Sequence, residues 1–119
     1  MNNYRIVIDP GHGGEDPGAS GNGIIEKNLT LDISKYMYDR FKELGIPVYI
    51  TRTTDETISP TERVKRILNA YGNNKNVIVV SNHINAGGAN GKNVGKASSV
   101  LFALKYKDFD LMLKLFFMS

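Results

Sequence analysis

The sequence contains no cysteine among its 119 residues, and its longest apolar runs are only five residues long. The first absence excludes disulfides, thiolate zinc sites and cysteine nucleophiles. The second excludes a transmembrane helix, which needs about 20 apolar residues, so we expect no membrane insertion. The amino terminus has no long apolar stretch followed by a small-residue cleavage site, so no signal peptide is predicted.

The sequence also lacks a basic cluster with interleaved aromatic residues. Its formal net charge is +3, but residues 1–91 hold ten basic and ten acidic side chains, so the whole excess lies in residues 92–119. Nucleic-acid binding is therefore not expected. The change in composition after residue 91 divides the chain into two predicted parts, an α/β portion at 1–91 and a divergent tail at 92–119.

Apolar residues make up 41% of the chain and charged residues 23%, which is typical of one globular domain. The apolar pattern predicts a strand, a helix, a strand, a helix and a strand, at residues 5–9, 29–44, 46–51, 59–71 and 77–80. This alternation predicts an α/β fold, a layered sheet of mostly parallel strands with helices on both faces. Residues 98–104 are a candidate fourth strand, residues 107–117 fit a strand or a helix, and the C-terminal part is expected to be incomplete.

Each predicted helix has a recognisable face or start. In the first helix, Tyr36 and Phe41 are assigned to the core, and the basic residues to the solvated face: Lys35, Arg40 and Lys42. The second helix begins with a capping serine, Ser59, followed by Pro60 at the first helical position and Glu62 to complete a capping box.

Polar side chains follow two strands that should lie close together in the sheet. His12 and His83, the two histidines of the chain, come two or three residues after the first and third predicted strands. Open parallel sheets place their ligand sites at this edge, and Glu26 stands between the glycine-rich loop and the first helix. Two neutral imidazoles and a carboxylate form a ligand set of the catalytic zinc type, with a fourth position open for water.

Each of these residues alone also has an ordinary explanation. A histidine after a strand is more often a hydrogen-bonded loop residue than a ligand. Glu26 alone fits a helix-start carboxylate favoured by the helix dipole. The glycine-rich loop at 10–23 could cradle a phosphate, but it has neither the Lys-Ser/Thr ending of a P-loop nor a GxGxxG pattern. The joint placement of both histidines favours the metal site.

The segments around these residues share a further pattern. They are residues 6–14 (IVIDPGHGG), 16–19 (DPGA), Glu26 with Asn28-Leu29, 51–55 (TRTTD), 61–63 (TER) and 81–86 (SNHINA). Together they resemble the zinc-dependent N-acetylmuramoyl-L-alanine amidases (the amidase type 3 catalytic domain) over roughly residues 4–88. The resemblance implies His12, Glu26 and His83 as zinc ligands. It also implies peptidoglycan as the partner and hydrolysis of the amide between N-acetylmuramic acid and L-alanine as the reaction.

The chain departs from this family near its end. The family uses a late glutamate for proton transfer, whereas no glutamate follows Glu62 here, so the catalytic residue is left unassigned. We interpret the chain as a truncated or frame-shifted amidase, with a divergent short member as the alternative. A catalytically silent zinc-binding or cell-wall-binding fragment is the second functional hypothesis, and a zinc hydrolase of another substrate class is a third.

Two further expectations concern location and assembly. The lack of a signal peptide fits an enzyme of the phage endolysin type, which stays in the cytoplasm until release and then acts at the cell wall, or an excised catalytic domain. An early end of the chain would leave a sheet edge or an apolar helix face uncovered near residues 111–117, so self-association through that edge is expected.

Overall fold

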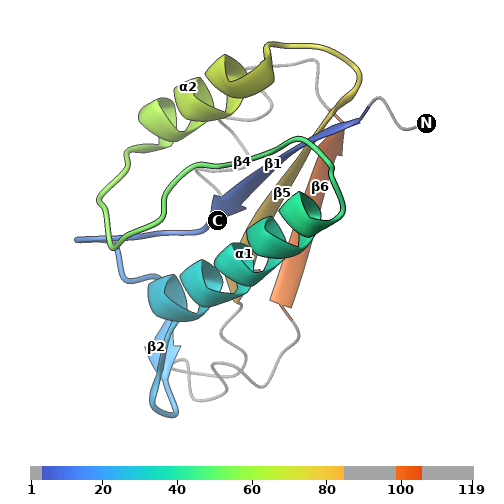
Figure 1. The fold of residues 1–119 in the computed structure, drawn as a ribbon. Helices are drawn as coiled ribbons and strands as arrows, with labels where there is room; N and C mark the ends of the chain where they lie inside the picture. Colours follow the sequence, from blue (N-terminus) through green and yellow to red (C-terminus); the bar gives the residue numbers. More distant parts are fainter. Residues whose placement is uncertain (1–3, 85–98, 106–119) are drawn as a thin grey trace.

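The computed structural model describes residues 4–84 and 99–105. Its main sheet has the order β4-β1-β5-β6, and the strands are β1 (Arg5–Pro10), β4 (Val48–Ile50), β5 (Val77–Ile84) and β6 (Ser99–Lys105). β1 pairs in parallel with both β4 and β5, whereas β6 runs antiparallel to β5 (Figure 1). The predicted α/β class with a mostly parallel sheet is confirmed.

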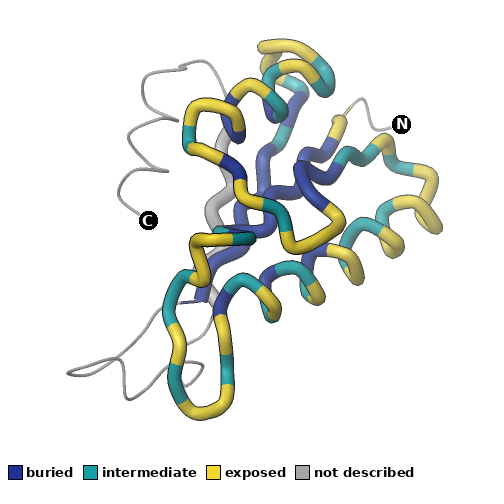
Figure 2. Tube along the Cα trace, turned by 90° about the vertical axis from the view of Figure 1, so that its left-hand side faces the viewer, coloured by how far each residue is buried: buried dark blue, intermediate teal, exposed yellow. Residues whose placement is uncertain are grey.

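The two helices cover opposite faces of this sheet. α1 (Glu26–Glu43) precedes β4, and α2 (Pro60–Tyr71) follows it. Because side chains alternate along a strand, Val7 of β1 packs on the α2 side, whereas Ile6 and Ile8 pack on the α1 side. The buried residues follow β1 and β5 through the middle of the molecule (Figure 2). Their partners are Val64, Ile67, Val77 and Val79 on the α2 side, and Ile50, Val80, Met37, Tyr38 and Phe41 on the α1 side.

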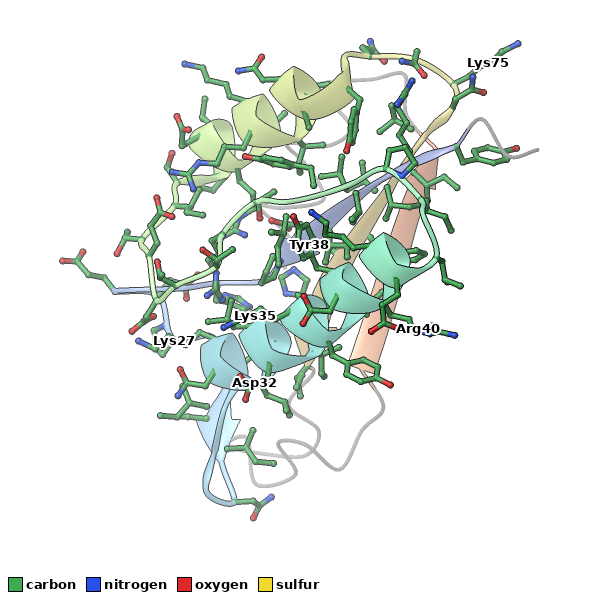
Figure 3. All side chains as sticks on the ribbon, viewed as in Figure 1. Lys27, Asp32, Lys35, Tyr38, Arg40 and Lys75 are labelled. Carbon is green, nitrogen blue, oxygen red and sulfur yellow. The ribbon has the colours of Figure 1, made fainter. Side chains whose placement is uncertain are left out.

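The prediction of the buried face of α1 is partly wrong. Phe41 packs on the core as expected, but Tyr36 is 74% exposed. The inward stripe of α1 is polar at its start, where Glu26, Thr30 and Ser34 are buried, so an apolar periodicity alone misses it. Tyr36 lies two residues beyond Ser34, about 200° around the helix, and therefore faces solvent. The basic side chains are exposed as predicted: Lys35, Arg40 and Lys42. Figure 3 shows Lys35 and Arg40 on the outer side of α1.

α2 begins and ends at the predicted residues. The Ser59 hydroxyl accepts the backbone N–H of Glu62 at 3.1 Å, and Pro60 is the first helical residue. The Glu62 carboxylate, expected to complete the capping box, accepts from Arg66 Nε at 3.1 Å. Gly72 ends the helix in a left-handed conformation, with φ of 76°, which glycine adopts without steric cost.

The third predicted strand is longer than expected, and this places His83 inside it. β5 continues past residue 80 to Ile84, between β1 and β6. The polar side chains of this extension find partners in the interior, since Ser81 Oγ donates to Asp9 Oδ2 at 2.7 Å and Asn82 Nδ2 to Ser34 Oγ at 2.9 Å. Polar residues therefore do not end the strand here, because their hydrogen bonds are satisfied within the fold.

The remaining elements lie at the margins of the sheet. β6 lies one residue further along the chain than the candidate fourth strand at 98–104. A small hairpin of β2 (Ser20–Gly21) and β3 (Ile24–Ile25) projects beyond the start of α1 (Figure 1). Neither described helix combines the length and apolar character needed to cross a bilayer. Residues 107–117 lie outside the described part, so self-association stays a prediction, which light scattering at high concentration would check.

Candidate metal centre

The three predicted ligands come together at one point above the sheet. His12 Nε2 lies 3.0 Å from Glu26 Oε2. His83 Nδ1 lies 3.3 Å from the same oxygen and 3.2 Å from His12 Nε2. The three residues come from separate parts of the chain: His12 from the loop after β1, Glu26 from the first position of α1, and His83 from the end of β5. Within the described residues, these side chains form a group able to hold a metal ion.

Two glycines make room for this cluster. A Cβ atom on Gly11 would lie 2.6 Å from His83 Cε1, and one on Gly18 would lie 2.7 Å from both Glu26 Oε1 and His12 Cδ2. Gly18 also has φ of 68°, which side chains rarely adopt. Gly11 and Gly18 are therefore required by close approach to the three side chains, and the phosphate-cradle alternative is not needed to explain these two glycines.

The carboxylate of Glu26 is held at both oxygens. Oε1 accepts the backbone N–H of Ala19 at 2.9 Å, and Oε2 accepts that of Ile84 at 2.8 Å. Burial opposes the charged form, but these hydrogen bonds and those from His12 and His83 outweigh it, and they hold the pKa of Glu26 well below its ordinary value. Glu26 is therefore a fixed anion at neutral pH.

His12 stands between two carboxylates. Its Nε2 faces Glu26, and its Nδ1 lies 2.8 Å from Asp16 Oδ2. Burial disfavours the charged imidazole, but the hydrogen bonds and charges of Glu26 and Asp16 prevail and raise the pKa of His12. The surroundings of His12 thus favour positive charge.

Buried cationic side chains hold the backbone of the His12 loop from below. Arg63 donates to the carbonyl of Pro10 at 2.8 Å and to that of His12 at 2.9 Å. Arg52 Nη2 donates to the carbonyl between them, on Gly11, at 3.0 Å. His12 itself has φ of 64°, which costs a non-glycine residue roughly 1–2 kcal/mol. Three anchored carbonyls in a row stabilise that strained conformation.

Asp9 connects Arg63 to the interior of the sheet through hydrogen bonds. Its side chain is fully buried, and Oδ1 accepts from Arg63 Nη1 at 2.7 Å and from Thr51 Oγ1 at 2.8 Å. Ser81 Oγ donates to its other oxygen. A buried charge persists only when it is paired and hydrogen-bonded, and Asp9 meets this condition with partners from β5, α2 and the loop after β4.

The donor set fits a zinc ion. Zinc in a tetrahedral site lies about 2.0–2.1 Å from histidine nitrogens and carboxylate oxygens, which puts the ligand atoms about 3.3 Å from one another. The observed separations are 3.0, 3.2 and 3.3 Å. The site supplies three protein ligands, the number typical of catalytic zinc centres.

Sequence reasoning named the three clustered side chains but missed those that hold them. Arg63 lies beside Val64 on the inward side of α2, where a charge is unexpected. Asp9 is a carboxylate at the end of an apolar strand, and this position was the sequence signal that a buried cation such as Arg63 would be needed. Asp16 and Arg52 were noted only as parts of matching segments. Their contacts join residues far apart in the sequence, and no local pattern reveals such pairs.

The comparisons with known proteins agree with this geometry. A family model described as N-acetylmuramoyl-L-alanine amidase (Amidase_3) matches residues 6–109. The sporulation-specific N-acetylmuramoyl-L-alanine amidase of Bacillus subtilis is 40% identical over 91 residues, covering 73% of this chain and 33% of that protein. The N-acetylmuramoyl-L-alanine amidase CwlM of Bacillus licheniformis is 40% identical over 89 residues, covering 73% and 34%.

The similarity extends to solved structures. The crystal structure of N-acetylmuramoyl-L-alanine amidase from Clostridium difficile 630 matches with a TM-score of 0.64 and 34% identity, over 73% of this chain and 46% of that one. The chain spans about a third of the length of the curated relatives it matches. With the family model matching most of its residues, the chain belongs to the N-acetylmuramoyl-L-alanine amidase family.

Proposed function

We propose that this chain supplies the metal-binding part of a peptidoglycan amidase, with His12, Glu26 and His83 as ligands of a zinc ion. The substrate bond would be the amide between N-acetylmuramic acid and the L-alanine of the stem peptide, in the bacterial cell wall. The observation that carries the proposal is the convergence of three ligand atoms within 3.0–3.3 Å of one another. The family to which the chain belongs supports the choice of substrate.

The residues of such a site would have different roles. Zinc bound there would polarise the scissile carbonyl and lower the pKa of a bound water toward about 7. Glu26 has both oxygens engaged by backbone N–H groups, so it serves as a fixed ligand and is poorly placed to move a proton. Asp16 lies on the Nδ1 side of His12, away from Glu26. The carboxylate that would carry the proton to the leaving amine is not assigned.

Metal content tests the first half of the proposal. Mass spectrometry of the full chain under native conditions should find about one zinc per chain. His12→Ala, Glu26→Ala and His83→Ala should each lose it, whereas Asp39→Ala, on the exposed side of α1, should keep it. Zinc retained by all three ligand variants would refute the site.

Activity tests the second half. With zinc present, the chain should release dye from labelled cell walls faster than its His83→Ala variant does. Hydrolysis of the proposed bond frees the amino group of L-alanine, so amino-terminal labelling of the products should identify alanine. New reducing ends without new alanine amino groups would show that a different bond is cut.

Within residues 4–84 and 99–105 no carboxylate is assigned to proton transfer at the candidate site, which leaves a second candidate, a silent zinc-binding or cell-wall-binding fragment. Without a carboxylate for proton transfer, hydrolysis loses typically about 10²–10⁴-fold in rate, whereas metal binding is unaffected. One zinc per chain combined with dye release equal to that of His83→Ala would establish this candidate in place of the enzyme.

A further inference from the structure

The imidazole of His12 is in contact with a carboxylate on each side. Its Nε2 is 3.0 Å from Glu26 Oε2, within the metal centre, and its Nδ1 is 2.8 Å from Asp16 Oδ2, outside it. We propose that Asp16 is a positioning residue of the metal centre, which fixes the proton of His12 on Nδ1 and directs the lone pair of Nε2 at the metal. This inference rests on the proposed zinc site.

The chemistry of imidazole makes this contact decisive. A neutral histidine has one N–H and one lone pair, and only the nitrogen with the lone pair binds a metal. An ionised carboxylate accepts hydrogen bonds and donates none. Asp16 can therefore bond to Nδ1 only when that atom carries the proton, which leaves Nε2 free to act as a ligand. Such outer carboxylates also make the imidazole a stronger base toward the metal.

The loop holds Asp16 in place for this role. Gly13 and Asp16 exchange two backbone hydrogen bonds, of 2.8 and 3.0 Å, in a tight turn. The turn contains Gly14 at φ of 60°. Asp16 Oδ1 accepts the N–H of Gly18 at 3.1 Å, while Oδ2 contacts His12 Nδ1 at 2.8 Å. Each oxygen of the carboxylate thus has its own partner, and the group is oriented before a metal binds.

A purely structural role explains this arrangement less well. The Asp16 side chain is 63% exposed, so it adds little to the core. A structural role would explain the hydrogen bond from Gly18 to one carboxylate oxygen, but it does not explain why the other oxygen contacts His12. A structural role predicts a loss of stability alone, whereas a positioning role predicts a loss of metal affinity together with the loss of the hydrogen bond at His12 Nδ1.

His83 provides an internal comparison. Its ring lies so close to Gly11 that a Cβ there would be 2.6 Å from Cε1 and 2.7 Å from Nδ1. The side chain of His83 is buried, and the residue lies near the carboxyl end of β5. Packing against the Gly11 backbone therefore limits the ring of His83. Removing Asp16 should release the ring of His12 at Nδ1 and leave the ring of His83 as it is.

The experiment measures zinc affinity in the full chain by competition with a chromogenic chelator. Asp16→Ala should weaken zinc binding by about 10- to 100-fold, the range for outer-shell partners of metal ligands. Asp16→Asn keeps an oxygen that can accept from Nδ1 and should lose less. The same substitutions at exposed Asp39 should leave affinity within about twofold, since substitutions at distant sites with no shared partners act independently.

A second measurement reports the hydrogen bond at Nδ1 directly. Long-range ¹H–¹⁵N spectra of the zinc-loaded chain should show His12 with its proton on Nδ1, as a ligand that binds through Nε2 requires. In zinc-loaded Asp16→Ala that proton loses its acceptor and should exchange with water faster, whereas the signals of His83 should not change. If circular dichroism shows that Asp16→Ala is unfolded, Asp16→Asn carries both measurements.

The outcomes separate the two proposals. No zinc binding by the unchanged chain would overturn the zinc site and the positioning role that rests on it. Zinc binding by the unchanged chain, with equal affinity and the same Nδ1 proton exchange in the folded Asp16 variants, would overturn the positioning role and leave the zinc site standing.

Discussion

Arg63 Nη1 lies 2.7 Å from Asp9 Oδ1, and this ion pair joins α2 to β1 with both side chains buried. The same guanidinium holds the carbonyls of Pro10 and His12. Through these contacts, one residue of α2 connects the interior of the sheet with the loop that carries a candidate ligand. Support of the metal centre and stability of the fold therefore depend on the same side chain.

Arg63→Ala should lower the free energy of unfolding by about 3–5 kcal/mol, because it leaves the carboxylate of Asp9 buried without its cation. Arg66, three residues along the same helix, is the matched control. Its pairs with Glu56 and Glu62 are partly exposed, so Arg66→Ala should cost about 1 kcal/mol. Urea unfolding followed by circular dichroism measures both, and equal losses would contradict the importance given to the buried pair.

Gly18→Ala should damage the metal centre beyond its effect on the backbone. Gly18 and Gly23 have similar positive φ angles, 68° and 76°, so alanine at either position costs roughly 1–2 kcal/mol in strain. Only at Gly18 would the new Cβ meet Glu26 and His12, since nothing lies within 4 Å at Gly23. Zinc affinity should therefore fall in Gly18→Ala and stay unchanged in Gly23→Ala. Equal affinities would show that the cluster can shift to accept a methyl group.

The fold was predictable from the sequence to the extent that apolar residues report burial. Val7 and Val64 lie in strongly patterned segments and pack as expected. The prediction that Tyr36 is in the core was wrong because the inward face of α1 begins with Glu26 and other polar residues. These residues are buried because they face the candidate site and the polar end of β5. β5 ran longer than predicted for the same reason, since its polar end is satisfied by tertiary contacts.

The proximity of the three candidate ligands was predictable from the sequence, whereas the side chains that support them were not. His12 and His83 follow from the rule that ligand sites lie at the carboxyl ends of parallel strands. Arg63 and Asp9 are 54 residues apart and meet only in the folded chain. Their pairing depends on the way α2 packs against β1, and spacing along the sequence gives no information about it.

Acid should weaken the contact between α2 and the loop after β4. The hydrogen bonds of Arg66 hold the pKa of Glu56 below its ordinary value of 4.5. A carboxylate with a lowered pKa stabilises the fold above its unfolded-state pKa, and this contribution is lost as the pH falls through the folded value. Glu56→Gln should therefore flatten the fall in stability below about pH 5. Identical urea midpoints for the two proteins across that range would argue against the contribution.

The charge of the acceptor should decide what a buried hydroxyl contributes. Ser81 Oγ donates to the Asp9 carboxylate at 2.7 Å, and Thr30 Oγ1 donates to the neutral carbonyl of Gly11 at 2.8 Å. Ser81→Ala leaves a buried charge short of a partner, so it should cost about 1.5–3 kcal/mol. Thr30→Val should cost about 1 kcal/mol, because Arg52 still donates to that carbonyl. Thermal and urea unfolding of the two variants test this order, and a larger loss in Thr30→Val would mean that the loop depends more on α1 than on the Asp9 network.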